Sequence, residues 1–176
     1  MVVKIDVLND KGEFTGEIRS KKEIHEEGLW HRIAYGFIFD ESNNVLLQKR
    51  ANHKLSSGKW DKTIGGHVET GESSYKTLLR KAKEEIGISL SPNEIEHFGC
   101  ALSDFSEGAI TCHIFAEGYI IRKSINIDSL KINEDEIEEL RWFKKEEILE
   151  MIKNKDERLI KKNFLWNFLT QMYKTL

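Results

Sequence analysis

The clearest hydrophobic pattern in the chain is a pair of apolar runs at residues 33–39 and 45–50, joined by the polar stretch 41–44. The first run contains no charged residue, which is typical of a strand buried on both faces of a sheet. The second run ends in charged residues and predicts a neighbouring strand. We therefore expect these two segments to form the centre of the sheet.

Shorter patterns surround this pair. Residues 4–8 and 14–18 flank a turn and predict a short hairpin, which is followed by a brief helical or loop segment over 21–28. A glycine-rich segment, 65–72, predicts a tight loop. Further strands are expected at four apolar stretches: residues 60–64, 95–102, 110–122 and 139–143.

Other segments carry apolar residues at helical spacing. Over 74–86 an apolar residue recurs every three or four positions, and Gly87 supplies a helix stop. A shorter helix is expected over 146–154. Residues 157–173 carry another apolar stripe and predict a carboxyl-terminal helix. We interpret this stripe as core packing, with a partner surface as the alternative.

Helices flanking a mixed sheet predict an α/β (α+β) fold in the form of an α/β/α sandwich. The chain has one proline, Pro92, and neither a Gly/Ser-rich linker nor a repeat. Residues 1–176 are therefore expected to form a single domain.

Charges are numerous but nearly balanced, with 27 basic and 30 acidic residues and a net charge of −3. This balance argues against nucleic acid or an anionic membrane as partner, so any anion site must be local. The absence of a signal-peptide pattern and of a membrane-spanning apolar stretch predicts a cytoplasmic protein. Cys100 and Cys112 form no CxxC pair and are expected to be buried, reduced thiols.

Candidate chemistry is concentrated at the end of the predicted helix 74–86. Two adjacent acids, Glu84 and Glu85, lie where the helix dipole disfavours negative charge, which favours a functional role over an ordinary solvated helix end. Residues three and four positions apart share one helix face, so carboxylates there can bind one cation together. Such hard oxygen ligands suit Mg²⁺ or Mn²⁺.

The same segment resembles the Nudix box, GX5EX7REUXEEXGU. The matching positions are Gly66, Glu72, Arg80, Glu84, Glu85, Gly87 and Ile88. The segment departs from the box at Lys81, which stands where a glutamate belongs, and at Ala82, a small choice for an aliphatic position. The predicted strand, glycine loop and helix supply the structural context that the motif requires.

The resemblance implies a Nudix fold and Mg²⁺-dependent hydrolysis of a diphosphate. It implies that the Gly66 carbonyl joins Glu84 and Glu85 on the metal, and that Glu72 and Arg80 pair to fasten the loop to the helix. A metal held in this way would polarise phosphorus and acidify a bound water.

Lys81 changes what the motif can do. It removes one carboxylate and adds a positive charge, so one metal ion is expected rather than several. Its ammonium group could pair with Glu85, an interaction of about 0.2 to 0.5 kcal/mol, or bind phosphate. A general base must then lie elsewhere, and Glu136 and Glu107 are the candidates.

A second resemblance covers roughly the first half of the chain, in segments 6–39, 46–54 and 58–73. These segments resemble the Nudix proteins related to isopentenyl-diphosphate isomerase. The resemblance implies a metal site and a diphosphate site. The implied metal ligands are His25, His31 and His67, with Glu85 as a Mg²⁺ ligand, and the implied diphosphate ligands are Lys21, Arg50, Lys54 and Lys81.

The chain departs from the isomerases at two places. Gly65 replaces their essential cysteine, which breaks the acid/base pair that allylic isomerisation requires. The metal-binding glutamates of a later strand are absent from the matching segment, 108–115. Metal binding and ordinary hydrogen bonding are therefore alternative roles for the three histidines.

Two tryptophans, Trp30 and Trp60, could stack on a nucleobase or cover an isoprenoid, with core packing as the alternative. We expect a Mg²⁺- or Mn²⁺-dependent hydrolase that cleaves a diphosphate linkage in a small molecule, such as a nucleoside diphosphate derivative. An isomerase-like enzyme acting on a prenyl diphosphate and a catalytically silent diphosphate-binding module are the alternatives. Monomer and homodimer are both compatible with the sequence.

Overall fold

The computed structural model of the protein describes residues 2–54, 56–107 and 110–176. Its strands are β1 (Lys4–Leu8), β2 (Phe14–Ser20), β3 (Trp30–Phe39), β4 (Val45–Arg50), β5 (Trp60–Asp61), β6 (Ile64–His67), β7 (Ile95–Glu107), β8 (Ile110–Arg122) and β9 (Ile137–Phe143). Its helices are α1 (Lys21–Glu26), α2 (Ser74–Ile86), α3 (Lys145–Lys153) and α4 (Asn163–Thr175), with 3₁₀ turns at Pro92–Glu94 and Ile127–Ser129.

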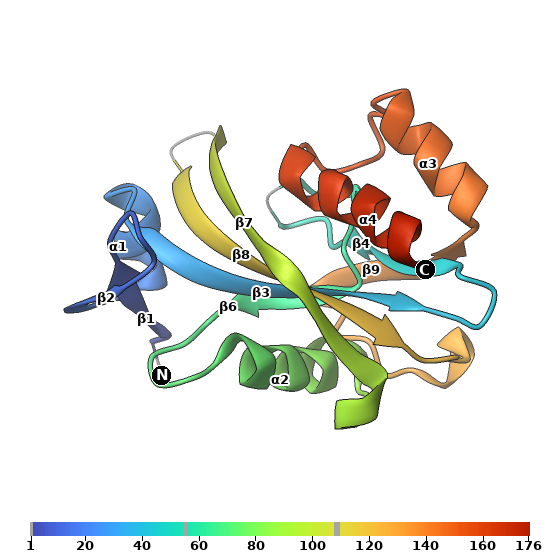
Figure 1. Cartoon of the computed structure of the whole chain (residues 1–176), viewed down its shortest axis with the longest axis horizontal. Helices are drawn as coiled ribbons and strands as arrows, with labels where there is room; N and C mark the ends of the chain where they lie inside the picture. Colours follow the sequence, from blue (N-terminus) through green and yellow to red (C-terminus); the bar gives the residue numbers. More distant parts are fainter. Residues whose placement is uncertain (1, 55, 108–109) are drawn as a thin grey trace.

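Strand β3 lies at the centre of a mixed sheet (Figure 1). It pairs in parallel with β8 over its whole length, from Trp30 opposite His113 to Phe39 opposite Arg122. It pairs in the antiparallel sense with β1, β4 and β6. Strand β4 also pairs with β5 and β9, and β8 pairs with β7. The predicted mixed sheet and its central pair are therefore confirmed.

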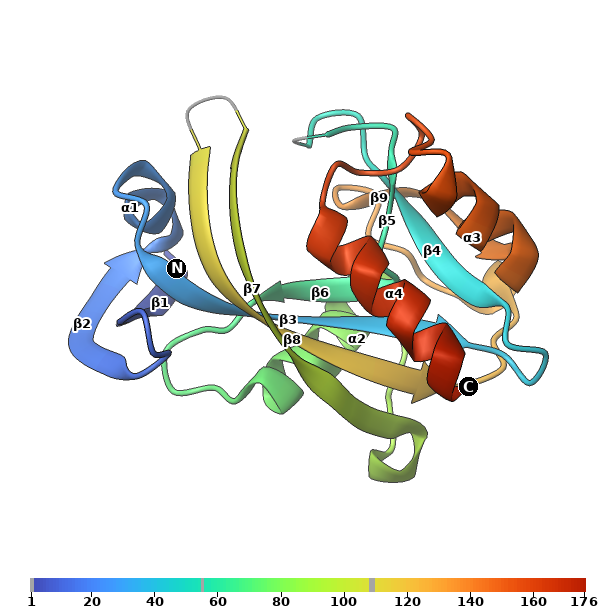
Figure 2. The same cartoon turned by 45° about the horizontal axis from the view of Figure 1, so that its top comes forward.

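The alternation of side chains along β3 divides the core between two layers, because successive residues of a strand point to opposite faces. Ala34 and Ile38 belong to a core cluster with α2, while Tyr35, Phe37 and Phe39 belong to a cluster with α3 and α4. All five are fully buried. Figures 1 and 2 show α2 on one side of the sheet and α3 with α4 on the other. The α/β/α arrangement is confirmed.

Helix α2 follows the predicted bounds. The side chain of Ser73 accepts a hydrogen bond from the backbone N–H of Lys76, which caps the start of the helix. The helix ends where Gly87 adopts a left-handed conformation with φ of 73°, which glycine reaches without a Cβ clash. Its buried face continues into Glu85, in the last turn.

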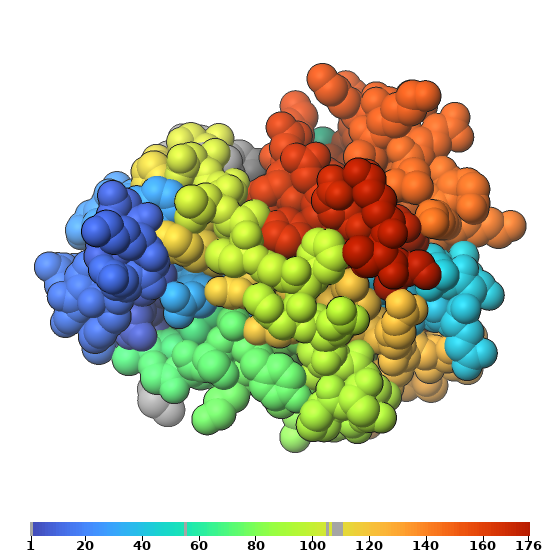
Figure 3. Space-filling model, viewed as in Figure 1, coloured from blue at the N-terminus to red at the C-terminus, as the bar shows by residue number. Residues whose placement is uncertain are grey.

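The amino-terminal hairpin and α1 lie at one end of the molecule, drawn in blue in Figure 3. Ser20 and Glu23 form a reciprocal cap, in which each side chain accepts a hydrogen bond from the other residue's backbone N–H, at 3.3 and 2.7 Å. Ile24, a residue of α1, is fully buried. This short helix carries Lys21 and His25.

The predicted glycine loop starts too early. Gly65 and Gly66 lie in β6, where they pair with Tyr35 and Ala34 of β3. The loop therefore begins after His67, and the glycine pair allows β3 and β6 to approach closely.

The predicted start of the carboxyl-terminal helix is also wrong. The backbone N–H of Trp60 donates to the carbonyl of Arg158 at 2.8 Å, and the N–H of Ile160 donates to the carbonyl of Trp60 at 3.0 Å. Residues 157–162 are extended or in a turn because their backbone groups bond to β5, and α4 begins only at Asn163. The apolar stripe on α4 is core, as predicted, since Leu165 and the residues that follow it at helical spacing are buried.

Cys112 is buried, whereas Cys100 is exposed. The prediction of two buried thiols is wrong for Cys100 because it lies on β7, an edge strand that pairs with no other strand than β8 within the described part of the chain. Among the described residues, no helix has both the length and the apolar character needed to cross a bilayer.

Candidate functional site

A cavity of about 360 Å³ lies where α1, α2 and the segment before α4 meet the sheet. Strands β3, β4, β6 and β8 contribute to its walls. Most of the sequence-predicted site residues line it. They are Lys21, His25, His31, Arg50, Lys54, Gly66, His67, Lys81, Glu85 and Glu136.

Cations dominate the wall of this cavity. The basic residues that line it are Lys21, Arg50, Lys54, Lys62, Lys81 and Lys162, and the acidic residues are Glu69, Glu85 and Glu136. Burial lowers the pKa of Lys21 and of Lys162, and neighbouring positive charges add to the effect. Lys62 and Lys162 were not predicted. Lys62 lies close to the glycine pair in sequence, but no local pattern connects Lys162 to the motif.

A buried carboxylate anchors two of these cations. Asp61 has only 1% of its side chain exposed, and its Oδ2 atom lies 2.8 Å from Nη1 of Arg50 and 3.1 Å from Nζ of Lys62. Burial opposes its ionisation, but Lys62, Lys162 and Arg50 together hold the pKa of Asp61 well below its usual range. Asp61 therefore fixes Arg50 and Lys62 against the cavity wall, a role that sequence analysis missed.

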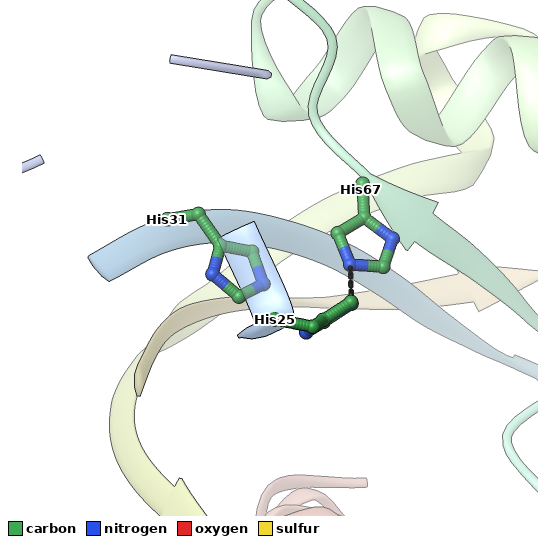
Figure 4. Close-up of side chains that lie close together, drawn as sticks. All are labelled: His25, His31 and His67. Atoms are coloured by element: carbon green, nitrogen blue, oxygen red, sulfur yellow. Dashed lines mark hydrogen bonds between the residues drawn. The ribbon is translucent and has the colours of Figure 1, made fainter. Parts of the chain in front are cut away.

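Three of the lining residues are histidines that lie close together (Figure 4). One ring nitrogen from each of His25, His31 and His67 lies within 4.8 Å of the others. The rings of His31 and His67 are stacked, with centroids 5.1 Å apart, and His25 meets both rings edge-on. Nε2 of His67 lies 3.1 Å from Nε2 of His25.

The environment keeps these imidazoles neutral. Burial lowers the pKa of His31 to about 4, and burial followed by the charge of His31 lowers the pKa of His67 well below its usual value. Burial also lowers the pKa of His25. Neutral imidazoles carry a free lone pair, which is the form that binds metal ions.

Glu85 is the carboxylate of the motif that faces the cavity. It is 4% exposed, and one oxygen accepts a hydrogen bond from the backbone N–H of Gly65 at 3.3 Å. Burial raises the pKa of Glu85 to about 7, although the charges of Lys62 and Lys81 oppose this shift. The carboxylate thus changes its protonation near neutral pH.

Glu84 does not join Glu85 in the cavity lining. Adjacent residues on a helix point about 100° apart, so both cannot face the same wall. The side chain of Glu84 is 44% exposed and lies 3.3 Å from Arg80 and 3.1 Å from Nζ of Lys81. Lys81 lies 3.8 Å from Glu85 as well. Lys81 therefore bridges the two acids at the cavity wall.

Glu136 and Glu107 are the two candidate general bases. Glu136 lines the cavity, and its Oε1 atom accepts a hydrogen bond from Nζ of Lys54 at 2.8 Å. Burial opposes ionisation of Glu136, but this hydrogen bond and the charges of Lys54 and Lys81 lower its pKa. The side chain of Glu107 lies outside the described residues.

The loop of the motif is fastened to α2. Glu72 accepts hydrogen bonds from Nε and Nη2 of Arg80 at 2.8 and 2.7 Å, and from the hydroxyl of Thr77 at 2.7 Å. Neither Glu72 nor Arg80 lines the cavity, whereas Gly66 does. The pair therefore holds the loop while the glycine backbone forms the wall.

Neither candidate stacking residue lines the cavity. Trp60 is 6% exposed and packs edge-on against Phe143 in the core. Trp30 lies against His113 and Phe115. Trp60 therefore has the alternative role considered for it, which is core packing.

The fold and the motif correspond to a known family. The family model for the NUDIX domain matches residues 29–164, which include β3, β6, α2 and every residue of the box. This protein belongs to the Nudix domain family.

The chain is also similar to individual proteins. The chain is 27% identical over 174 residues to a protein of Clostridium acetobutylicum named an uncharacterized Nudix hydrolase, with 97% of this chain and 84% of the relative covered. It is 38% identical over 81 residues to the isopentenyl-diphosphate Delta-isomerase of Serratia proteamaculans, covering 46% of this chain and 45% of that enzyme. The crystal structure of DR0079 from Deinococcus radiodurans has the same fold, with a TM-score of 0.64, 22% identity, and 86% of this chain and 89% of that chain covered.

Proposed function

We propose that this protein is a Nudix hydrolase that requires a divalent metal and cleaves a diphosphate linkage in a small molecule. The observation that carries the proposal is the convergence of cationic side chains, the buried Glu85 and three clustered histidines on one cavity. Family membership supports hydrolysis in general, and the chemistry of the cavity supports the phosphate substrate.

The cations supply the binding energy for the diphosphate. The guanidinium of Arg50 can hold two phosphate oxygens at once, whereas Lys21, Lys54 and Lys81 act as point charges. Asp61 already holds Arg50 in place, so little side-chain freedom is lost when an anion binds. Three acidic residues in the lining leave the cations in excess. This excess favours a ligand with several anionic oxygens.

The residues fit a divalent metal at two places. Nε2 of His31 is buried and, among the described residues, has no hydrogen-bond partner, so a cation there would satisfy its lone pair. Three imidazoles suit ions such as Zn²⁺ or Fe²⁺, whereas the Glu85 carboxylate and the Gly66 carbonyl suit Mg²⁺ or Mn²⁺. A metal bound here would supply charge neutralisation at phosphorus and a more acidic water.

The protein's own residues complete the reaction. We assign Glu136 as the group that accepts the proton of the attacking water, since its lowered pKa keeps it ionised at neutral pH and it lines the cavity. Lys54, which donates to Glu136, orients this carboxylate. Glu84 supports the site through Lys81, and would act as a metal ligand only by turning away from Arg80 and Lys81.

The geometry at Gly65 favours hydrolysis over allylic isomerisation. An isomerase would need a proton-carrying side chain at this position. A Cβ added to Gly65 would lie 2.5 Å from the carbonyl oxygen of Ala34 and 2.8 Å from Cα of Tyr35, at a φ of 154°. The backbone therefore leaves no room for that side chain.

A silent diphosphate-binding module is the second candidate, and the position of Lys81 favours it. Nζ of Lys81 lies 3.1 Å from Glu84 and 3.8 Å from Glu85, where it competes with a metal for both carboxylates. In that case the cavity binds a diphosphate and releases no product.

The deciding experiment is phosphate release from a panel of nucleoside diphosphates, nucleotide sugars, dinucleotides and prenyl diphosphates with Mg²⁺ or Mn²⁺. We expect the wild type to hydrolyse at least one class, and Glu85→Gln to lose at least about a hundredfold of the rate, equivalent to about 2.7 kcal/mol. Lys83→Glu, a charge change on an exposed residue of the same helix, serves as the control.

The alternatives give different results on the same panel. Tight diphosphate binding without release by the wild type, together with hydrolysis gained in Lys81→Glu, would identify the silent module. Exchange of allylic protons without phosphate release would identify the isomerase.

A further inference from the structure

The hydrogen bonds around the histidines assign protons to individual ring nitrogens. Nδ1 of His31 lies 2.9 Å from the carbonyl oxygen of Leu29. A carbonyl can only accept a hydrogen bond, so Nδ1 carries the proton and Nε2 keeps its lone pair. That Nε2 is the buried atom without a partner among the described residues. His31 is thus held in the tautomer that presents Nε2 to a cation.

His25 is held from two sides. Its Nε2 lies 3.1 Å from Nε2 of His67, within the cluster, while its Nδ1 lies 3.3 Å from Sγ of Cys112. The backbone of Thr111, the neighbour of Cys112 on β8, also makes a hydrogen bond with His25. The two nitrogens of one ring therefore have separate surroundings, with Nε2 facing the histidines and Nδ1 facing β8.

The position of Cys112 follows from the register of β8. Ile114 lies opposite His31 in the parallel pair, and Cys112 lies two residues earlier, on the same face of the strand. Both residues line the cavity. His113, between them, contacts Trp30 and Asp104 instead. The thiol is therefore presented to the histidine cluster by the sheet itself.

We infer that Cys112 is a positioning residue for the metal site, because its sulfur accepts the Nδ1–H of His25 and so keeps the ring's lone pair on Nε2, the nitrogen that faces the other histidines. Histidine ligands commonly donate their second ring N–H to a carboxylate or carbonyl, which fixes the tautomer and the ring orientation. Here a thiol takes that role. The inference rests on the metal binding by His25, His31 and His67 that is part of the proposed function.

Cobalt binding tests this role directly, with the purified full-length protein and Co²⁺ as the probe. Cys112→Ala removes the sulfur, and Cys112→Ser restores a smaller acceptor. We expect Cys112→Ala to lower the Co²⁺ affinity about tenfold, at the lower end of the usual effect for such partners because Thr111 still holds the ring. Cys112→Ser should recover part of this loss. Competition with a chromogenic chelator measures the affinities.

Two control variants distinguish the loss of His25 positioning from a general disturbance of packing. Cys100→Ala removes the exposed thiol, and Ile120→Val removes a similar volume from the same face of β8, at a buried position that does not line the cavity. Both should bind Co²⁺ as the wild type does. Nitrogen-15 correlation spectra of the imidazoles give a second measurement, in which His25 should be protonated at Nδ1 in the metal-free wild type, and the share of the tautomer protonated at Nε2 should rise in Cys112→Ala.

Three results would overturn the inference. An unchanged Co²⁺ affinity and an unchanged His25 tautomer in Cys112→Ala would show that the thiol does not position the ring, while the metal site itself would stand. A sulfur-to-cobalt charge-transfer band in the wild type, lost in Cys112→Ala, would make Cys112 a direct ligand. A wild type that binds no Co²⁺ would overturn both this inference and the histidine metal site of the proposed function.

Discussion

Glu72 accepts two hydrogen bonds from the guanidinium of Arg80, at 2.8 and 2.7 Å, and this pair joins the loop after β6 to the middle of α2. Planar bidentate pairs of this kind are the strongest arrangement available to arginine and a carboxylate. The hydrogen bonds from Arg80 and Thr77 outweigh burial and lower the pKa of Glu72 to about 2. The pair of Glu72 and Arg80 therefore stabilises the folded protein and also fixes the shape of the site.

We predict that Glu72→Gln lowers the free energy of unfolding by roughly 1.5 kcal/mol, the lower end of the range for hydrogen bonds to charged groups, because the pair is about a quarter exposed. A depressed carboxyl pKa adds stability above pH 4.5 that is lost as the pH falls toward 2. Urea unfolding at pH 7 and pH 3 measures both effects. Glu17→Gln, in an exposed pair with Arg19, should change stability by less than about 0.5 kcal/mol. Equal effects of the two variants would contradict the prediction.

The raised pKa of Glu85 predicts that the stability of the metal-free protein depends on pH in the opposite sense to the effect of Glu72. Its folded-state pKa, about 7, exceeds its ordinary value of 4.5, so the folded state binds the proton more tightly. Stability should therefore fall as the pH rises from about 4.5 to 7, by roughly 3 kcal/mol relative to Glu85→Gln. Chemical unfolding of both proteins in the presence of a chelator measures this difference. If the difference in unfolding free energy between the two proteins does not vary with pH, burial does not raise the pKa of Glu85.

Lys62 and Lys162 are expected to bind phosphate, because both line the cavity beside Arg50. Lys62→Met and Lys162→Met should each weaken the binding of inorganic diphosphate by roughly ten- to a hundredfold, the loss expected for one charge-assisted hydrogen bond. Isothermal titration calorimetry with Mg²⁺ present measures the affinities. Lys76→Met removes an exposed lysine of α2 and provides the control. Affinities that match this control would exclude the two lysines from the anion site.

Alanine substitutions at Gly65 and Gly71 distinguish the cost of a steric clash from the cost of backbone strain. Both have positive φ, but an added Cβ meets the backbone of Ala34 and Tyr35 only at Gly65, while nothing lies within 4 Å at Gly71. We predict that Gly71→Ala costs about 1 kcal/mol, the penalty of a left-handed residue, and that Gly65→Ala costs roughly 1 to 3 kcal/mol more through overpacking. Thermal unfolding of the two variants compares them directly. Equal costs would show that β3 and β6 can separate to admit a side chain.

The local elements of the site could be predicted from sequence because their causes are local. Helix α2 has its observed bounds because apolar side chains recur at helical spacing and Gly87 stops the helix. The glycine pair was placed in a loop rather than in β6, because the pairing of Gly65 with Tyr35 depends on a strand thirty residues earlier in the chain. The start of α4 was missed for a similar reason, since backbone bonds to Trp60 keep residues 158–160 out of the helix.

The sequence by itself determined the family motif, the layers of helix and sheet, and most of the charged residues and histidines that line the cavity, because periodicity and fixed spacing are properties of neighbouring residues. Only the tertiary structure decided which of two adjacent acids faces the cavity, since the orientation of α2 turns Glu85 inward and leaves Glu84 beside Arg80. It also brought Lys162 to the cavity and Cys112 to His25, across 87 positions of the chain. Contacts at such separations arise from packing, which no local pattern records.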